Sequence, residues 1–166
     1  TASPMTGRII AATKRMLDAC CNELRDCLWD LRSSSLDRRD TSAALRQAIA
    51  PHLGEAEATI DVRIPRGKLS DTLFHTLLNI VRELTVNALR HGKAHHIHIA
   101  GGLCGEAIDL SVSDDGTGFD PAKTPGVNEG HFGLQGIRER LDALGGTLTI
   151  DSSIGRGTRV SLTIET

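Results

Sequence analysis

The sequence predicts an α/β (α+β) two-layer sandwich, in which a mostly antiparallel mixed sheet is covered by helices on one face and preceded by one long helix. Two observations lead to this fold class. From residue 58 onward, short segments with strand character alternate with longer segments of helical period. Glycine-rich turns separate several of the strands, as expected of antiparallel hairpins.

The N-terminal part follows a different pattern. Residues 8–32 are predicted to form one helix, because apolar side chains recur at alternating steps of three and four residues. Such a narrow stripe is typical of a helix that packs against a partner helix. The serines at 33–35 break the pattern, so we expect one unit at 1–40 and a larger domain at 41–166. The stripe consists of Leu17, Cys20, Leu24, Cys27 and Leu31.

Helical segments recur within residues 41–166. The segment 41–50 should be closed by Pro51 and Gly54. The longest segment, 69–90, has Ser70 as its candidate N-cap. The segment 133–144 should end at the two glycines that follow it. The apolar stripe predicted for the longest helix consists of Leu73, Leu77, Val81, Leu84 and Ala88.

The predicted strands include two hairpins. One hairpin should turn through the glycines at 101–105, and the other joins the last two strands. His96 and His98 alternate on a strand, so an exposed strand face is favoured over a metal site for them. The strand segments are 58–64, 95–100, 106–113, 147–151 and 158–164.

A polar stripe runs along the longest predicted helix. Asn79, Glu83 and Asn87 are spaced four residues apart and therefore project from one face. A solvated outer face is the simplest interpretation. Carboxylate and amide oxygens are also the ligands that Mg²⁺ prefers, so Glu83 and Asn87 could hold a metal and orient a nucleophile. His91 continues the stripe beyond the helix end.

Two glycine-rich loops follow this helix. Asp114-Asp115-Gly116-Thr117-Gly118-Phe119 comes at the end of a strand, where glycines let the backbone approach a ligand closely. A carboxylate there can accept a hydrogen bond from the exocyclic amine of adenine, which guanine lacks at that position. The alternative is a simple Asp/Gly turn.

The second loop is 130–136, which runs directly into a helix. Glycines before a helix start expose backbone N–H groups, and the helix dipole favours anions there. The loop matches neither a Walker loop nor a dinucleotide fingerprint, and a flexible glycine-capped loop is the alternative. A third stretch, 155–158, offers the Thr158 hydroxyl to an adenine pocket or forms only a hairpin turn.

The order of these motifs resembles the GHKL ATPase superfamily with its Bergerat nucleotide-binding fold, over about residues 58–164. Within it, Glu83-Leu84-x-x-Asn87-Ala88-x-x-His91 is similar to sensor histidine kinases of the NarL-partnered type. The stretch 133–141, followed by Leu144-Gly145-Gly146, is similar to the same group.

The resemblance implies a role for each site residue. Asn87 should ligate Mg²⁺, which bridges the phosphates of ATP. Glu83 should act as the base or water-orienting group near the γ-phosphate, and Asp114 should bind the adenine amine. Residues 119–132 should form a lid over ATP. Further contacts to ATP are implied for His91, Lys93, Gly116, Gly118, Gly133, Leu134, Gly136 and Thr158.

The function implied is that of the ATP-binding catalytic domain of a two-component sensor histidine kinase. Such a domain transfers the γ-phosphoryl group to a His on a dimerisation helix, and the group then passes to an Asp of a response regulator. Residues 24–32 resemble the second helix of that dimerisation hairpin, and the parent protein is expected to be a homodimer. No R-E-x-H-D-like pattern precedes residue 52, so we expect a fragment that cannot phosphorylate itself.

Other enzymes of the superfamily would keep the same pocket, notably a hydrolytic ATPase or an anti-sigma-type serine kinase. A non-catalytic nucleotide-binding or dimerisation module is a third interpretation. Arg138-Glu139-Arg140 and the coiled-coil stripe favour the histidine kinase.

Composition excludes several other classes. The formal net charge is −2 and aromatic residues make up 2%, which argues against a nucleic-acid partner. No apolar run approaches the roughly 20 residues of a membrane-spanning helix, so we expect no membrane contact by this chain. A cytoplasmic location is expected, with a parent protein that can be anchored in the inner membrane. The chain begins with Thr, which suggests a fragment.

Overall fold

The structure is a computed structural model that describes residue 13, residues 40–122 and residues 132–165. The predicted helix 8–32 and most of the predicted lid, residues 123–131, lie outside the described residues. The fold belongs to the C-terminal compact unit, Asp37–Thr166. Of the helices that the structure describes, none combines the length and the apolar composition needed to cross a lipid bilayer.

A single five-stranded sheet forms one layer, with its strands in the order β1-β2-β3-β5-β4. β1 and β2 are parallel, and the other three neighbouring pairs are antiparallel. The expected mixed, mostly antiparallel sheet is therefore confirmed. The strands are β1 (Glu57–Arg63), β2 (His96–Cys104), β3 (Ala107–Asp114), β4 (Thr147–Ser152) and β5 (Thr158–Glu165).

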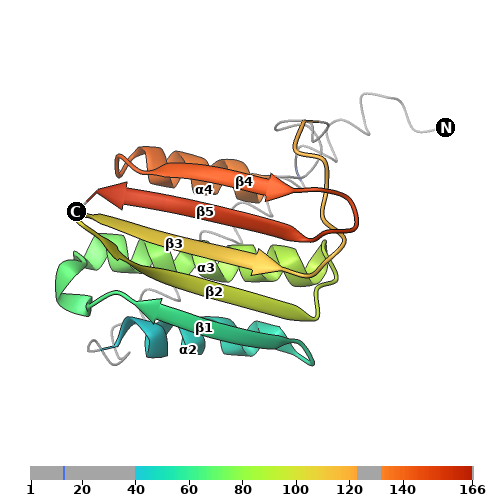
Figure 1. Cartoon of the computed structure of the whole chain (residues 1–166), viewed down its shortest axis with the longest axis horizontal. Coiled ribbons are helices and arrows are strands. Elements are labelled where there is room, and N and C mark those ends of the chain that lie inside the picture. Colours follow the sequence, from blue (N-terminus) through green and yellow to red (C-terminus); the bar gives the residue numbers. More distant parts are fainter. Residues whose placement is uncertain (1–12, 14–39, 123–131, 166) are drawn as a thin grey trace. The chain divides into compact units, whose positions relative to one another are not determined.

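The helices that the structure describes form the second layer on one face of the sheet (Figure 1). α2 packs behind β1, α3 contacts β3, and α4 contacts β4. This confirms the two-layer sandwich. The helices are α2 (Thr41–Leu53), α3 (Asp71–Arg90) and α4 (Phe132–Asp142).

Alternation along β3 decides where its last residue points. Ile108, Leu110 and Val112 are buried against the helix layer, because alternate side chains of a strand share one face. Asp114 continues that series at the carboxyl end of the strand. The alternation of side chains along the strand thus places the half-buried Asp114 carboxylate at the boundary between the sheet and the helices.

α3 forms where its apolar stripe and cap predict it. Ser70 is the N-cap, and its side-chain oxygen accepts a hydrogen bond from the Leu73 N–H at 3.2 Å. All five residues of the predicted stripe are buried. The neighbouring polar stripe, with Glu83 and Asn87, is left only partly buried. The helix is therefore fixed in rotation by its core face, and this fixes the direction of its polar face.

Two boundaries differ from the sequence expectation. α2 continues through Pro51 to Leu53, and Pro51, which has no N–H to donate to the carbonyl oxygen four residues earlier, lies exposed in the last turn. β2 runs through Gly101 and Gly102, and the chain turns at Gly105 instead, where φ is 65°. Gly101 is needed within the strand, since a Cβ there would lie 2.9 Å from the Asp109 carbonyl oxygen.

Candidate functional site

The first group of candidate residues lies where α3 meets the start of α4. Glu83 and Asn87 are one turn apart on α3. A Cβ on Gly133 would lie 2.6 Å from Glu83 Oε1 and 3.1 Å from Asn87 Nδ2. A side chain at this position would have to displace the ends of the Glu83 and Asn87 side chains, so the first turn of α4 lies directly against these two polar groups. Asn79, the third member of the stripe, has a buried Oδ1 with no hydrogen-bond partner among the described residues.

Arg140, two turns after Gly133 on α4, forms an ion pair with Glu83. The Arg140 and Glu83 side chains are 37% and 28% exposed, so the charges are only partly screened by solvent. The pair joins α4 to the polar face of α3. Sequence reasoning did not find it, although the seven-residue spacing from Gly133 puts Arg140 on the same face of α4. Glu83, Asn87, Gly133 and Arg140 are called the helix end of the site.

The second group gathers around Asp114 at the end of β3. Asp114 pairs in register with Thr158 on β5, and Asp114 Oδ1 accepts a hydrogen bond from the Gly116 N–H at 2.8 Å. Burial raises the pKa of Asp114, while backbone hydrogen bonds from Gly116 and Thr158 act in the opposite direction. The carboxylate is thus held on the helix side of the sheet in a partly dehydrated position.

Three glycines let separate chain segments cross beside Asp114. A Cβ on Gly116 would lie 2.5 Å from the Gly92 carbonyl oxygen. A Cβ on Gly118 or Gly157 would collide with backbone oxygens, those of Ser153 and Asp114 respectively. Gly118 and Gly157 also have positive φ values of 59° and 71°, which side chains disfavour. The glycine-rich motifs are therefore required by close packing of backbone.

Ser152 at the end of β4 joins these segments, and sequence reasoning missed it. Its Oγ accepts a hydrogen bond from the Phe119 N–H at 2.9 Å and donates to the Gly157 carbonyl oxygen at 3.0 Å. The Thr158 Oγ1 lies 2.9 Å from the same Oγ, so the Thr158 hydroxyl belongs to this network. No local motif marks such a serine, because its partners come from distant parts of the sequence. Asp114, Gly116, Gly118, Ser152, Gly157 and Thr158 are called the strand end of the site.

The turn after α3 connects the two ends. The Gly92 N–H donates to the Asn87 carbonyl oxygen at 3.2 Å, and the Gly92 carbonyl oxygen accepts from the Thr117 N–H at 2.8 Å. His91 and Lys93 flank Gly92, are exposed, and lie at the carboxyl end of α3. Lys93 has a φ of 52°. This turn thus links Asn87 at the helix end to Gly116 at the strand end.

Two predicted residues make weaker contributions to this geometry. A Cβ on Gly136 would lie 3.7 Å from the Arg140 side chain, which is an ordinary contact, so packing does not require glycine there. Leu134 is half-buried in the first turn of α4. Of the predicted lid, the structure describes Phe119–Ala122 and the helix start only.

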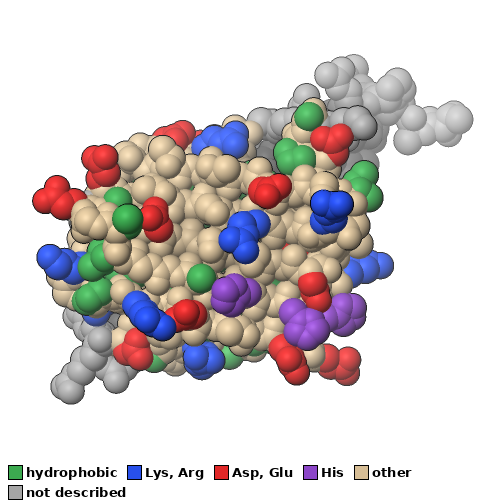
Figure 2. Space-filling view, viewed as in Figure 1, with side chains coloured by type: hydrophobic (Ala, Val, Ile, Leu, Met, Phe, Trp, Pro, Cys, Tyr) green, Lys and Arg blue, Asp and Glu red, His purple; other side chains and the backbone are tan. Residues whose placement is uncertain are grey.

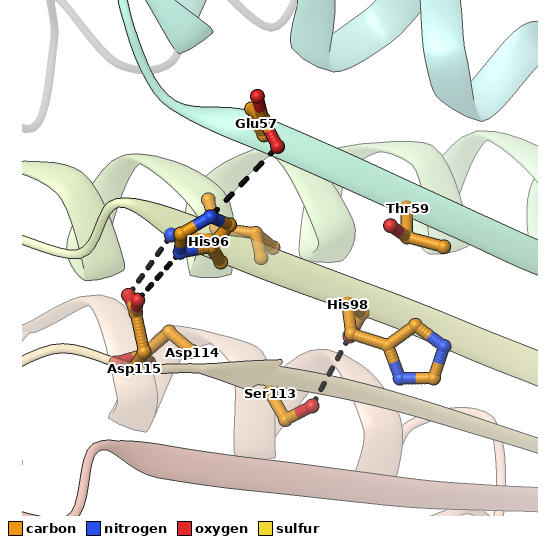
Figure 3. A pocket seen from close by; sticks show the side chains of 8 residues that line it. Glu57, Thr59, His96, His98, Ser113, Asp114 and Asp115 are labelled. Atoms are coloured by element: carbon orange, nitrogen blue, oxygen red, sulfur yellow. Dashed lines mark hydrogen bonds and ion pairs between the residues drawn. The ribbon is translucent and has the colours of Figure 1, made fainter.

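A shallow hollow of about 310 Å³ lies on the open face of the sheet (Figure 3). Glu57, Thr59, His96 and His98 contribute to its lining, together with the end of β3. Figure 2 shows this face, where His and acidic side chains gather at one side. The hollow contains no residue of the helix end. Asp114 belongs both to its lining and to the strand end, so the hollow meets the site only there, from the face of the sheet that the helices leave open.

A family model of histidine kinase-, DNA gyrase B- and HSP90-like ATPases matches residues 74–166. The matched residues include both ends of the site. The chain belongs to this ATPase family, which confirms the resemblance to the GHKL superfamily.

Similar proteins include a sensor protein and a histidine-protein kinase/phosphatase. The nitrate/nitrite sensor protein NarQ of Escherichia coli is 34% identical over 160 residues, covering 93% of this chain and 27% of NarQ. The signal transduction histidine-protein kinase/phosphatase UhpB of Salmonella typhimurium is 35% identical over 144 residues, covering 85% of this chain and 28% of UhpB. The chain thus spans about a quarter of the length of these relatives.

A solved structure supports the fold independently. The ATP-binding domain of PrrB from Mycobacterium tuberculosis matches with a TM-score of 0.59 at 20% identity, covering 76% of this chain and 93% of that domain. At this identity the match shows a shared fold.

Proposed function

We propose that the chain carries the ATP-binding catalytic domain of a two-component sensor histidine kinase. One observation carries the proposal. The turn at Gly92 brings the helix end, with Glu83 and Asn87, next to the strand end, with Asp114. The Asp114 carboxylate offers a hydrogen-bond acceptor for a nucleobase. The Glu83–Asn87 pair offers ligands for a metal ion that would accompany the charged phosphates. Membership of the ATPase family supports ATP as the ligand.

The strand end would select adenine. The Asp114 carboxylate can accept a hydrogen bond from the adenine amino group, whereas guanine presents a carbonyl oxygen there and would leave the carboxylate unpaired. The half-buried position of Asp114 makes that mismatch costly. Close backbone crossings at Gly116 and Gly157 keep the carboxylate in place, so the selection would rest on a rigid frame.

The helix end would hold the phosphates. The start of α4 lies against Glu83 and Asn87, and a helix N-terminus favours anions. Gly133, Leu134 and Gly136 would present this turn to the phosphates, and His91 and Lys93 would add side chains near them. The exposed position of both after α3 is compatible with that role.

Asn87 would ligate Mg²⁺, and Glu83 would orient the attacking group near the γ-phosphate. The donor set fits this ion, because an amide and a carboxylate oxygen are hard ligands and Mg²⁺ takes its remaining ligands from water and phosphate. The ion would neutralise phosphate charge during transfer. Arg140 holds the Glu83 carboxylate at the start of α4, so the protein contributes positioning and charge, the two requirements of phosphoryl transfer.

Residues 1–40 would be part of the dimerisation region, with the second helix of its hairpin at 8–32. The match to NarQ covers more of the chain than residues 41–166 alone, so it extends into this region. The phosphoacceptor His would lie on a helix outside this chain. The partners of the parent protein would be its own second copy in a homodimer and a response regulator. The ATP-binding domain would lie in the cytoplasm.

A calorimetric titration tests the proposal. We expect the chain to bind one ATP in the presence of Mg²⁺ and to bind GTP at least about tenfold more weakly. With γ-labelled ATP the chain itself should acquire no label, whereas a longer protein that includes the acceptor helix should form acid-labile phosphohistidine. Equal binding of GTP and ATP, or no binding of either, would contradict the nucleotide assignment. Multiple-turnover phosphate release without phosphohistidine would favour a hydrolytic ATPase.

A further inference from the structure

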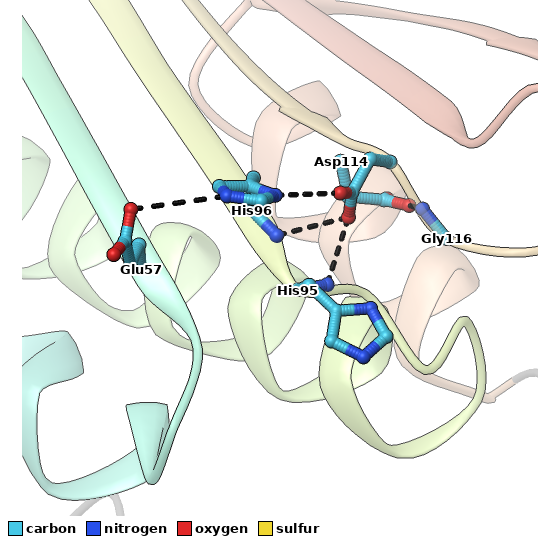
Figure 4. Close-up of polar contacts among 6 residues, drawn as sticks. Glu57, His95, His96, Asp114 and Gly116 are labelled. Atoms are coloured by element: carbon cyan, nitrogen blue, oxygen red, sulfur yellow. Dashed lines mark hydrogen bonds and ion pairs between the residues drawn. The ribbon is translucent and has the colours of Figure 1, made fainter.

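Asp115, the neighbour of Asp114, points to the other face of the sheet and joins two strands there. Its Oδ1 accepts hydrogen bonds from the backbone N–H groups of His95 at 2.8 Å and His96 at 2.9 Å. The Asp115 N–H in turn donates to the His96 carbonyl oxygen at 3.3 Å. Figure 4 shows His95 and His96 at the start of β2 beside the turn that carries Asp114 and Gly116. One exposed carboxylate thus ties the start of β2 to the turn after β3.

The His96 ring adds a side-chain contact to these backbone hydrogen bonds, and Asp115 and His96 together are called the clamp. His96 Nδ1 lies 2.8 Å from Asp115 Oδ2, and its Nε2 lies 3.8 Å from Glu57 Oε2 on β1 (Figure 3). The ring therefore stands between two carboxylates, which favour its protonated form. The hydrogen bond and the charge of Asp115 raise the pKa of His96. The pKa of the Asp115 carboxyl is held well below its usual range, chiefly by the backbone N–H of His96.

The clamp acts on residues that the nucleotide site uses. The turn after β3 is fixed from one side by the Gly92 carbonyl oxygen, which accepts from the Thr117 N–H, and from the other by Asp115. Both attachments lead to the chain between the end of α3 and the start of β2, which follows the last turn of α3 that contains Asn87. Loss of either would let Asp114 and Gly116 move relative to α3.

We propose that Asp115 is a positioning residue for the base-binding end of the nucleotide site, and that the charge on His96 strengthens its hold. The inference rests on the proposed function, because it assumes that Asp114 contacts the base. Asp115 does not touch the nucleotide and acts only through the turn. Among the described residues, the charged or titratable groups around His96 are Glu57 on β1, His95 just before β2, His98 on β2, Asp114 at the end of β3 and Asp115 just after it.

The sign of the pH effect follows from the direction of the shift. Because the pKa of His96 is raised in the folded protein, the extra hold is complete below its ordinary value of 6.5 and is lost as the pH rises through the raised value. Neutral His96 can still donate from Nδ1, so the loss is partial. Its exposed position limits the effect on nucleotide affinity to roughly twofold to threefold.

The experiment measures the Kd of the chain for ADP between pH 5.5 and 8.5. ADP is chosen because it lacks the γ-phosphate and depends more on the base than ATP does. We expect Asp115→Ala to raise this Kd roughly tenfold, since two charge-assisted backbone hydrogen bonds are lost. Asp61→Ala removes an exposed carboxylate from β1, paired only locally with Arg63, and should stay within about twofold of the original chain.

The pH profile separates positioning from general stability. Asp115→Asn keeps an oxygen for both backbone N–H groups, so it should fold even where the alanine variant does not. We expect this variant and His96→Gln to lose the pH-dependent part of ADP binding that Asp61→Ala retains. The comparison cancels the titration of ADP itself, which all variants share.

The outcomes are distinguishable. Binding of ADP by Asp115→Ala within about twofold of the original chain, or an unaltered pH profile in Asp115→Asn, would overturn the inference and leave the proposed function standing. An original chain that binds no ADP would contradict the proposed function and this inference together. A raised Kd for Asp115→Ala, with the profile flattened in Asp115→Asn and His96→Gln, would support it.

Discussion

The two ends of the site are held together by different kinds of contact. The strand end is closed by backbone, because Gly118 and Gly157 cross other segments where no side chain fits. The helix end is joined by side chains, chiefly the Glu83–Arg140 ion pair, around a single close approach at Gly133. Backbone crossings are rigid and intolerant of substitution, whereas partly exposed ion pairs can be replaced at small cost. Changes to the glycines of the strand end should therefore damage the fold, loss of its Asp114 carboxylate should damage base recognition, and changes at the helix end should alter phosphate and metal binding selectively.

The largest effect expected is at Gly157 in the strand end. Gly157→Ala would place a Cβ against the Asp114 carbonyl oxygen in a buried position with positive φ. We expect the free energy of unfolding to fall by about 4 kcal/mol, from collision and backbone strain together. Gly155→Ala is the matched control, since Gly155 has a φ of 81° but nothing within 4 Å. It should lose only about 1 kcal/mol, from strain alone. Urea unfolding measures both losses. Equal losses of unfolding free energy in the two variants would show that no close backbone contact excludes a side chain at Gly157.

Removal of the Asp114 carboxylate should come next. Asp114→Ala is expected to raise the Kd for ATP and for ADP by about 100-fold, because the base would lose its hydrogen-bond acceptor. Folding stability should change little, since burial raises the pKa of Asp114 and the charged form is held there at some cost. Asp109→Ala removes an exposed carboxylate of the same strand and should leave nucleotide binding unchanged. The strand end would not select the base if both variants bound ADP equally well.

At the helix end, Asn87→Ala should separate metal from base binding. We expect the Kd for ATP with Mg²⁺ to rise about tenfold while the Kd in the presence of a chelator stays within about twofold. Asn79→Ala, two turns earlier on the same stripe, is the matched control and should leave both constants unchanged. Titration curves that respond identically to Mg²⁺ in the two variants would remove Asn87 from the metal site.

The smallest effect expected concerns the ion pair that joins α4 to α3. In a double-mutant cycle of Glu83→Gln and Arg140→Met, we expect a coupling of about 0.5 to 1 kcal/mol in the free energy of unfolding, because both side chains are partly exposed. Arg138→Met, on the exposed side of α4, should show no coupling to Glu83. A coupling that is zero for Arg140 as well would mean that other contacts hold α4 in place.

The sequence predicted those parts of this site that depend on local pattern. The rotation of α3 follows from its apolar stripe and the Ser70 cap, so Glu83 and Asn87 could be placed on one face in advance. The turn from Asp114 to Gly118 is marked by a short motif. Glycine was misleading at Gly101, where it permits close strand pairing and not a turn.

The remaining parts depend on contacts between distant residues. Arg140 and Glu83 are 57 positions apart, and Ser152 meets Phe119 from 33 positions away. No periodicity connects such pairs, because only the packed layers bring them together. Asp115 was visible as part of a motif, but its hold on β2 required the register Ile97↔Asp114, which places the start of β2 beside it.

The central claim is that both ends bind one molecule of ATP, and an NMR titration of the labelled chain tests it most directly. With a non-hydrolysable ATP analogue and Mg²⁺, we expect the backbone amide signals of 114–118 and 157–158 to shift together with those of 87–93 and 133–136. Both groups should follow one binding curve with a stoichiometry of one. Shifts confined to one end, or two curves with different midpoints, would contradict the claim.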